Sequence, residues 1–249
     1  MTRKSFALLV MCLVLPSLAG NADAQTKITV TDGDEAAAFN PAEGWSQTNP
    51  GVWERHTKDG RIETFVSSAE GLSSVLPRLR DKEKQLLAAY LTNATEANKR
   101  ALDAQADLVQ AVAANVASAT SREKSAGPAA AVACTRTYGY TASIGQFHCI
   151  HASRASASYS VSDAVSCPEQ CTVHAYSYAQ TTSVGACGTP TVNSDSCDQT
   201  GTNVSCTTYA DTVYGNACYH YAFASVHCPQ LSNLFLSVSD SSTACVCPC

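Results

Sequence analysis

The chain has 249 residues, and lysine does not occur after Lys124. Between residues 134 and 249 the only basic residues are Arg136 and Arg154, against six acidic ones, so the net charge of this segment is −4. Such a surface repels phosphate backbones and has no basic patch that would hold an anionic membrane. We therefore expect no nucleic-acid partner and no membrane insertion.

Long apolar runs are absent beyond the first 24 residues, since none approaches the roughly 18 residues that a membrane-spanning helix needs. At the start of the chain, Arg3 and Lys4 precede an apolar run, and Ala22-Asp23-Ala24 forms an A-x-A cleavage site. Residues 1–24 are thus predicted to be a secretory signal. The mature protein is predicted to be secreted, either extracellular or periplasmic.

Strong catalytic motifs are also missing. The sequence contains no G-x-S-x-G, no H-E-x-x-H, no P-loop and no dinucleotide-binding fingerprint. No catalytic residue and no cofactor is therefore assigned. An enzyme remains an alternative, because five histidines lie in the segment 134–249 together with Asp163, Asp195, Asp198 and Asp211. This alternative predicts a cleft that gathers at least one histidine and one carboxylate.

Cysteine, by contrast, is abundant. All cysteines except Cys12 lie between residues 134 and 249, and an even number in an exported chain indicates a disulfide framework. The predicted disulfide cysteines are Cys134, Cys149, Cys167, Cys171, Cys187, Cys197, Cys206, Cys218, Cys228, Cys245, Cys247 and Cys249. Their connectivity stays open, and a protease inhibitor or toxin-like effector is a further alternative for such a segment.

The histidines and acidic residues provide only weak signals for a metal. His148, His151 and His227 lie beside cysteines, but the spacing of a matched zinc site is absent and cysteines in an oxidising compartment pair with each other first. Asn193 and Asp198 lie in a stretch that lacks the glycine and distal glutamate of an EF-hand. We predict no metal, and a polar turn at the latter stretch.

The N-terminal part shows two different periodicities. Residues 25–68 alternate as strands do, and Asp59-Gly60 between two such runs predicts a β-hairpin, with Trp45 and Trp53 packing against the helices that follow. Residues 69–120 have apolar residues at helical spacing and predict an αα-hairpin, with a continuous coiled-coil stalk as the alternative. Because proline is tolerated only near the first turn, Pro77 places the start of the first helix between Ser73 and Leu76.

The remaining boundaries follow from composition. Residues 121–133 have the glycine, proline and alanine content of a linker. Residues 134–249 contain short runs rich in serine, threonine, valine and tyrosine, which predict a sandwich-like all-β domain. The predicted fold class is α+β: a β-hairpin and an αα-hairpin followed by a disulfide-rich β domain. The helical region is a candidate oligomerisation element.

A Tyr-x-Tyr pair followed by small residues and a cysteine occurs three times. The pairs are Tyr138 with Tyr140, Tyr176 with Tyr178, and Tyr219 with Tyr221. Residues two apart in a strand share a face, so each pair projects to one side. The residues on the opposite face are small, with His220 as the larger exception, and would let two sheets approach closely. The pairs either stabilise a sheet or form an exposed platform for a glycan or protein ligand.

These observations favour a secreted, non-catalytic binding or surface-associated protein. Its six repeated tyrosines are the candidate ligand-binding residues, and a glycan, a cell-envelope component or another protein is the candidate partner.

Overall fold

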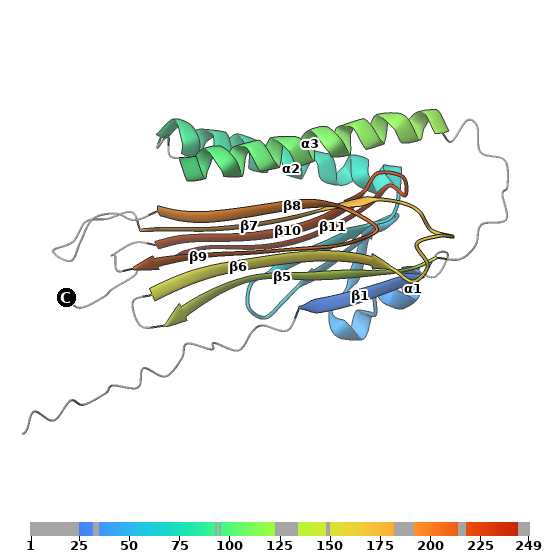
Figure 1. The fold of residues 1–249 in the computed structure, drawn as a ribbon, viewed down its shortest axis with the longest axis horizontal. Coiled ribbons are helices and arrows are strands. Elements are labelled where there is room, and N and C mark those ends of the chain that lie inside the picture. The colour runs from blue at the N-terminus through green and yellow to red at the C-terminus, as the bar shows by residue number, and fades with distance from the viewer. Residues whose placement is uncertain are drawn as a thin grey trace, which may run out of the picture.

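The computed structural model describes residues 25–31, 35–92, 94, 96–122, 134–147, 150–181, 192–213 and 218–243. Its strands form two antiparallel sheets, and two long helices cover the outer face of the larger sheet (Figure 1). The predicted α+β class with disulfide-bonded C-terminal strands is therefore confirmed. The predicted export signal and residues 123–133 of the predicted linker lie outside the described residues.

The smaller sheet has the strand order β1-β5-β6-β9. Its strands are β1 (Thr26–Thr31), β5 (Thr135–Phe147), β6 (Ile150–Val161) and β9 (Asn203–Val213). The strand nearest the N-terminus thus pairs with the first strand of the cysteine-rich segment.

The larger sheet has the order β2-β3-β4-β11-β10-β7-β8. Its strands are β2 (Ser46–Asn49), β3 (Val52–His56), β4 (Ile62–Val66), β7 (Cys171–Thr181), β8 (Val192–Gly201), β10 (Cys218–Cys228) and β11 (Asn233–Thr243). The predicted hairpin is β3–β4, with Gly60 at a φ of +81°, and β4 pairs with β11. A short helix α1 (Glu35–Ala38) and a 3₁₀ turn (Pro41–Glu43) lie between β1 and β2.

The helices α2 (Ala69–Thr92) and α3 (Glu96–Arg122) pack on each other as the predicted αα-hairpin, so the stalk alternative is wrong. Their apolar sides bury Leu72, Leu76 and Val112 against the larger sheet. Neither of these helices, nor any other helix among the described residues, has an apolar stretch suited to crossing a bilayer.

The predicted start of the first helix is wrong, because α2 begins at Ala69 and Pro77 lies inside it. The Ser68 hydroxyl accepts a hydrogen bond from the Gly71 backbone N–H (3.0 Å) and thereby caps the first turn. The Ser73 hydroxyl donates to the Ala69 carbonyl (3.0 Å). Burial of the apolar side of α2 outweighs the backbone hydrogen bond that Pro77 cannot donate.

The two sheets meet through small side chains. Ala157 of the smaller sheet and Ala222 and Ala224 of the larger one are fully buried in one shared core. The hydroxyls of Ser177 and Thr208 lie 2.8 Å apart and join β7 to β9 across the interface. For β7 and β10, the prediction that small residues let the sheets approach is therefore confirmed.

In β5 the alternation is reversed, so the same prediction is wrong there. Tyr138 and Tyr140 point into the space between the sheets and are fully buried, whereas Gly139 faces outward. A Cβ at Gly139 would lie 2.3 Å from the Ser158 hydroxyl, so a larger residue there would require the Ser158 and Gln25 side chains to move. The tyrosine hydroxyls reach polar partners: Tyr138 accepts from Asn233 (3.2 Å).

A buried carboxylate binds the other tyrosine of this pair. Tyr140 donates to Glu63 Oε2 (2.9 Å), and Glu63, with no exposed surface, lies between the guanidinium groups of Arg55 (2.5 Å) and Arg61 (3.3 Å). This cluster satisfies a charge whose burial without a partner would be costly. It joins the N-terminal strands β3 and β4 to β5 of the opposite sheet.

The tryptophans pack on the inner side of the N-terminal strands, so the prediction that they pack against the helices is wrong. Trp45 and Trp53 lie 4.9 and 5.0 Å from the ring of Phe39, measured between ring centroids. Phe39 also stacks on Phe65 (4.6 Å). These rings belong to the core between the two sheets.

Three of the predicted disulfides are present: Cys134–Cys167, Cys171–Cys228 and Cys197–Cys206. The last joins β8 of the larger sheet to β9 of the smaller one. Bonds of this kind are typical of an oxidising, non-cytoplasmic compartment. Cys149, Cys187, Cys218, Cys245, Cys247 and Cys249 lie outside the residues whose side chains the structure describes.

The close approach of the sheets predicts that Ala222→Leu destabilises the protein. The added atoms have no room between the sheets, and such overpacking costs about 1–3 kcal/mol. Denaturant unfolding measures the loss of stability. The control is Ala152→Leu, because Ala152 is half-exposed on the outer face of β6. Equal unfolding free energies for the two variants would contradict it.

The disulfides are expected to differ in their effect on stability. In the chain-entropy account, the unfolding free energy lost when a disulfide is removed grows with the length of the loop it closes. The expected loss is about 4 kcal/mol for Cys171–Cys228, with a sequence separation of 57. It is about 2.5 kcal/mol for Cys197–Cys206, with a sequence separation of 9. Thermal unfolding of the two paired Cys→Ala variants measures the order. A larger loss for the shorter loop would contradict it.

Candidate functional site

The outer face of the larger sheet carries a cluster of aromatic side chains beneath the helices. Tyr176 and Tyr178 of β7 lie beside Tyr221 and Phe223 of β10, and the register pairs Tyr178 with Tyr221 and Tyr176 with Phe223. The rings of Tyr176 and Tyr221 are 6.1 Å apart, and those of Tyr221 and Phe223 are stacked at 6.3 Å. We call these four residues the aromatic face.

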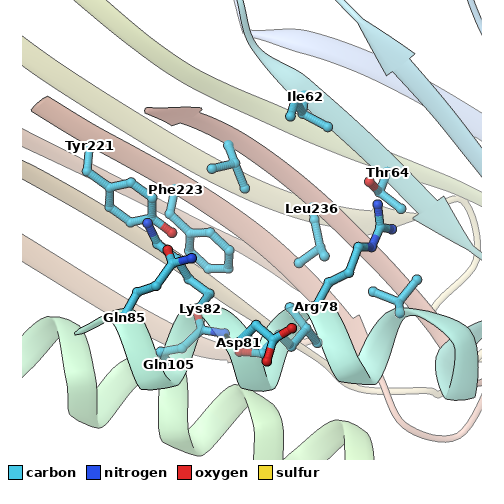
Figure 2. Close-up of a pocket in the computed structure, with 13 residues that line it drawn as sticks. Ile62, Thr64, Arg78, Asp81, Lys82, Gln85, Gln105, Tyr221, Phe223 and Leu236 are labelled. Carbon is cyan, nitrogen blue, oxygen red and sulfur yellow. Dashed lines mark hydrogen bonds between the residues drawn. The ribbon is translucent and has the colours of Figure 1, made fainter. Parts of the chain in front are cut away.

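A cavity of about 380 Å³ separates part of the aromatic face from α2 (Figure 2). Its apolar wall comes from both helical and sheet side chains. These are Ile62, Val75, Leu79, Tyr221, Phe223, Leu236 and Val238. A volume of this size lies within the range of pockets that hold small ligands.

Polar side chains of α2 lie along the helix edge of the cavity, as Figure 2 shows for Arg78, Asp81, Lys82 and Gln85. The Arg78 guanidinium pairs with Glu54 of β3 at 2.5 Å. The Lys82 ammonium lies 4.2 Å from the centroid of the Tyr221 ring, a cation–π contact. The cavity is thus apolar inside and charged along one edge.

Two buried polar residues complete the lining. Gln105 of α3 donates from Nε2 to the Leu79 carbonyl of α2 at 3.0 Å. Thr64 of β4 donates to Glu54 Oε1 at 3.4 Å. Both hold the walls in place, since they tie α3 to α2 and β4 to β3.

The predicted ligand-binding tyrosines lie in two separate places. Tyr138 and Tyr140 are buried between the sheets, whereas Tyr176, Tyr178 and Tyr221 are buried under the helices. Burial raises the pKa of Tyr178 to about 12. Only Tyr221 of these five lines the cavity. The side chain of Tyr219 lies outside the described ones, and ligand binding by the six tyrosines stays a prediction.

The other lining residues were not singled out from sequence. The alternation of Tyr221 with Phe223, and of Leu236 with Val238, is a signal that they share a face. This alternation does not show that α2 leaves a cavity above these side chains. The cavity depends on where a helix from residues 69–92 settles on strands more than a hundred residues later, and no local pattern encodes that distance.

Two of the described histidines, His174 and His227, pack within the sheet and against α3. His174 Nδ1 of β7 lies 2.5 Å from Asp198 Oδ1 of β8, and His227 Nε2 lies 3.3 Å from Asn115 Nδ2 of α3. The predicted polar turn at Asn193 to Asp198 is wrong, because these residues form β8, whose polar side chains suit an edge strand.

A histidine and a carboxylate do meet in the pair of His174 and Asp198. The pocket beside His174 has about 10 Å³. Among the described residues, no group of three or more His, Cys, Asp or Glu side chains is placed to hold a metal ion. His148 and the side chain of His151 lie outside the described part of the chain.

No protein-family model matches the chain, and no curated protein resembles it closely enough to count as a relative. The residues that line the cavity are therefore the basis for the functional proposal.

The contact of His227 with α3 predicts an acid-sensitive fold. Burial lowers the pKa of His227 to about 4, whereas an unfolded histidine titrates near 6.5. The unfolded chain therefore binds a proton that the folded chain excludes, and stability falls as the pH drops from 6.5 toward 4. From this group we expect unfolding to cost about 2 kcal/mol less at pH 5 than at pH 7.5.

Urea denaturation at the two pH values measures the effect in the wild type and in His227→Gln, which should lose most of it. His56→Gln, at an exposed position of β3, is the matched control and should behave as the wild type. The same pH dependence in all three proteins would show that His227 is not the group responsible.

Proposed function

We propose that this is an exported, non-catalytic binding protein that holds a small ligand with a largely apolar body in the cavity between α2 and the larger sheet. The observation that carries the proposal is the 380 Å³ cavity, with its apolar wall and its charged edge. Pockets of this size with few polar groups are the usual binding sites of small molecules.

The chemistry of the wall selects the ligand class. Tyr221 and Phe223 offer ring faces, while Leu236 and Val238 of the neighbouring strand offer aliphatic surface. Transfer of apolar ligand surface from water to this wall is favourable by roughly 25 cal/mol for each Å². Arg78, Lys82 and Gln85 at the edge would orient a polar group of the ligand toward solvent.

Binding is favoured over catalysis by what lines the cavity. Among the described residues of its wall and edge, Asp81 is the only carboxylate, and there is no histidine, cysteine or serine. The Lys82 ammonium lies over the ring face of Tyr221, and the Thr64 hydroxyl donates to Glu54. General acid–base and nucleophilic catalysis need such groups within hydrogen-bond reach of one another. Neither member of the His174–Asp198 pair lines the cavity, although the ring of His174 lies 5.8 Å from that of Phe223.

The cell compartment is consistent with this role. Three disulfides and the predicted export signal indicate that the ligand is met outside the cytoplasm. Cross-linked strands under the cavity would keep its wall in one arrangement, which lowers the entropy cost of binding.

Filling the cavity should abolish ligand binding. Val238→Trp places an indole in the cavity, and we expect its affinity for the neutral apolar dye Nile red, measured by fluorescence titration, to fall at least roughly tenfold. The matched control is Val165→Trp, because Val165 is 91% exposed and lies outside the cavity. It should bind the dye as the wild type does.

Circular dichroism and thermal unfolding verify that both variants are folded. The proposal fails if the folded wild type does not bind the dye, or if the two tryptophan variants bind it equally well.

A further inference from the structure

Most of the described side chains on the outer face of the smaller sheet are serine and threonine hydroxyls. This face lies on the side of the sandwich away from the helices (Figure 1). The register places Thr29, Thr137, Ser160 and Asn203 in one row across its four strands. Parallel to this row lie Ser158 beside Ser205, and Ser156 beside Thr207. All of these side chains are exposed or half-buried.

The spacing of these groups is regular. Neighbouring strands lie about 4.8 Å apart and alternate residues along a strand about 6.7 Å apart. Each hydroxyl can donate one hydrogen bond and accept two, so it can meet another hydroxyl in either role. Among the described side chains in these rows, Lys27 and Arg154 are the only charged ones.

Among the described side chains of this face, one is aromatic. Tyr209 of β9 is 46% exposed, the largest exposure of any described tyrosine ring on either sheet. The Arg154 guanidinium of β6 lies 5.6 Å from its centroid, and Asp195 of β8 accepts a hydrogen bond from the Tyr209 backbone N–H (3.2 Å). The ring therefore has a fixed base and an open side, next to Thr207 and Ser156.

We propose that this face binds a neutral polysaccharide, with a sugar ring stacked on Tyr209 and its hydroxyls bonded to Arg154 and the adjacent rows. A sugar ring combines an apolar C–H face with hydroxyls at its edge, and Tyr209 with the serine and threonine rows offers the complement of both. The described side chains of this face carry few charges, which matches an uncharged polymer and gives little attraction to a charged one.

Other partners fit this surface poorly. Protein interfaces concentrate several aromatic, methionine and arginine side chains at a dry centre, whereas here one tyrosine stands among small hydroxyls. Nucleic acids and anionic membranes need clusters of basic residues, and Lys27 and Arg154 lie in different rows at different strands.

This site is separate from the cavity, because the larger sheet lies between the two (Figure 1). A result for one therefore does not decide the other. A protein with both sites would be fixed to a carbohydrate surface through the smaller sheet while the cavity under α2 stays open to its ligand.

The test is a depletion isotherm of the full mature protein on colloidal chitin and on microcrystalline cellulose. We expect the wild type to bind at least one of them. Tyr209→Ala should bind roughly tenfold more weakly, whereas Tyr209→Phe, which keeps the ring, should stay within about threefold of the wild type.

A charge introduced into the rows gives a second variant. Thr207→Glu should weaken binding by a similar factor, because its longer side chain occupies the space beside Tyr209 in which the sugar ring would lie. Thr200→Glu, at an exposed position of β8 in the other sheet, is the matched control and should bind as the wild type does. Thermal unfolding confirms that each variant is folded.

Three results would overturn the proposal. The first is a folded wild type that binds neither polysaccharide, and the second is equal weakening by Thr207→Glu and Thr200→Glu. The third is a wild-type dimer in size-exclusion chromatography that Thr207→Glu separates into monomers, since the face would then join two copies of the chain.

Discussion

The larger sheet is packed on both faces, and this double burial constrains the rest of the structure. Its inner face must meet the smaller sheet, and its outer face must support the helices. β10 satisfies both with a strict alternation, in which Ala222 and Ala224 face the smaller sheet and Tyr221 and Phe223 face α2. A one-residue slip would exchange the two faces, so register and fold depend on each other.

Much of the fold could be predicted from sequence, because period-two and helical patterns are local. The αα-hairpin, the hairpin around Gly60 and most C-terminal strands follow from such patterns. Alternation shows that Tyr138 and Tyr140 share a face but not which face it is. The pair in β5 points inward, while the pair in β7 points to the helices, since only the larger sheet has a packed outer side.

The errors share one physical cause, which is that tertiary packing outweighs local preference. Pro77 lies inside α2 because the helix begins before the predicted start at Ser73. Ser68 caps its first turn, and the helix buries both Leu72 and Leu76. β8 is polar because it lies at an edge of its sheet, where its Cys197 is bonded to Cys206. The cavity could not be predicted, since it exists between elements far apart in the chain.

The same constraint separates the two proposed sites. Because the helices use the outer face of the larger sheet, any imperfect fit of α2 leaves a space lined by aromatic and aliphatic side chains, which suits an apolar ligand. No helix in the described part of the chain covers the smaller sheet, so most of its described outward residues are those that water tolerates, with Tyr209 as the exception. In the proposed polysaccharide site the exposed ring of Tyr209 supplies the apolar surface on which a sugar would stack, and the surrounding small hydroxyls leave its open side accessible.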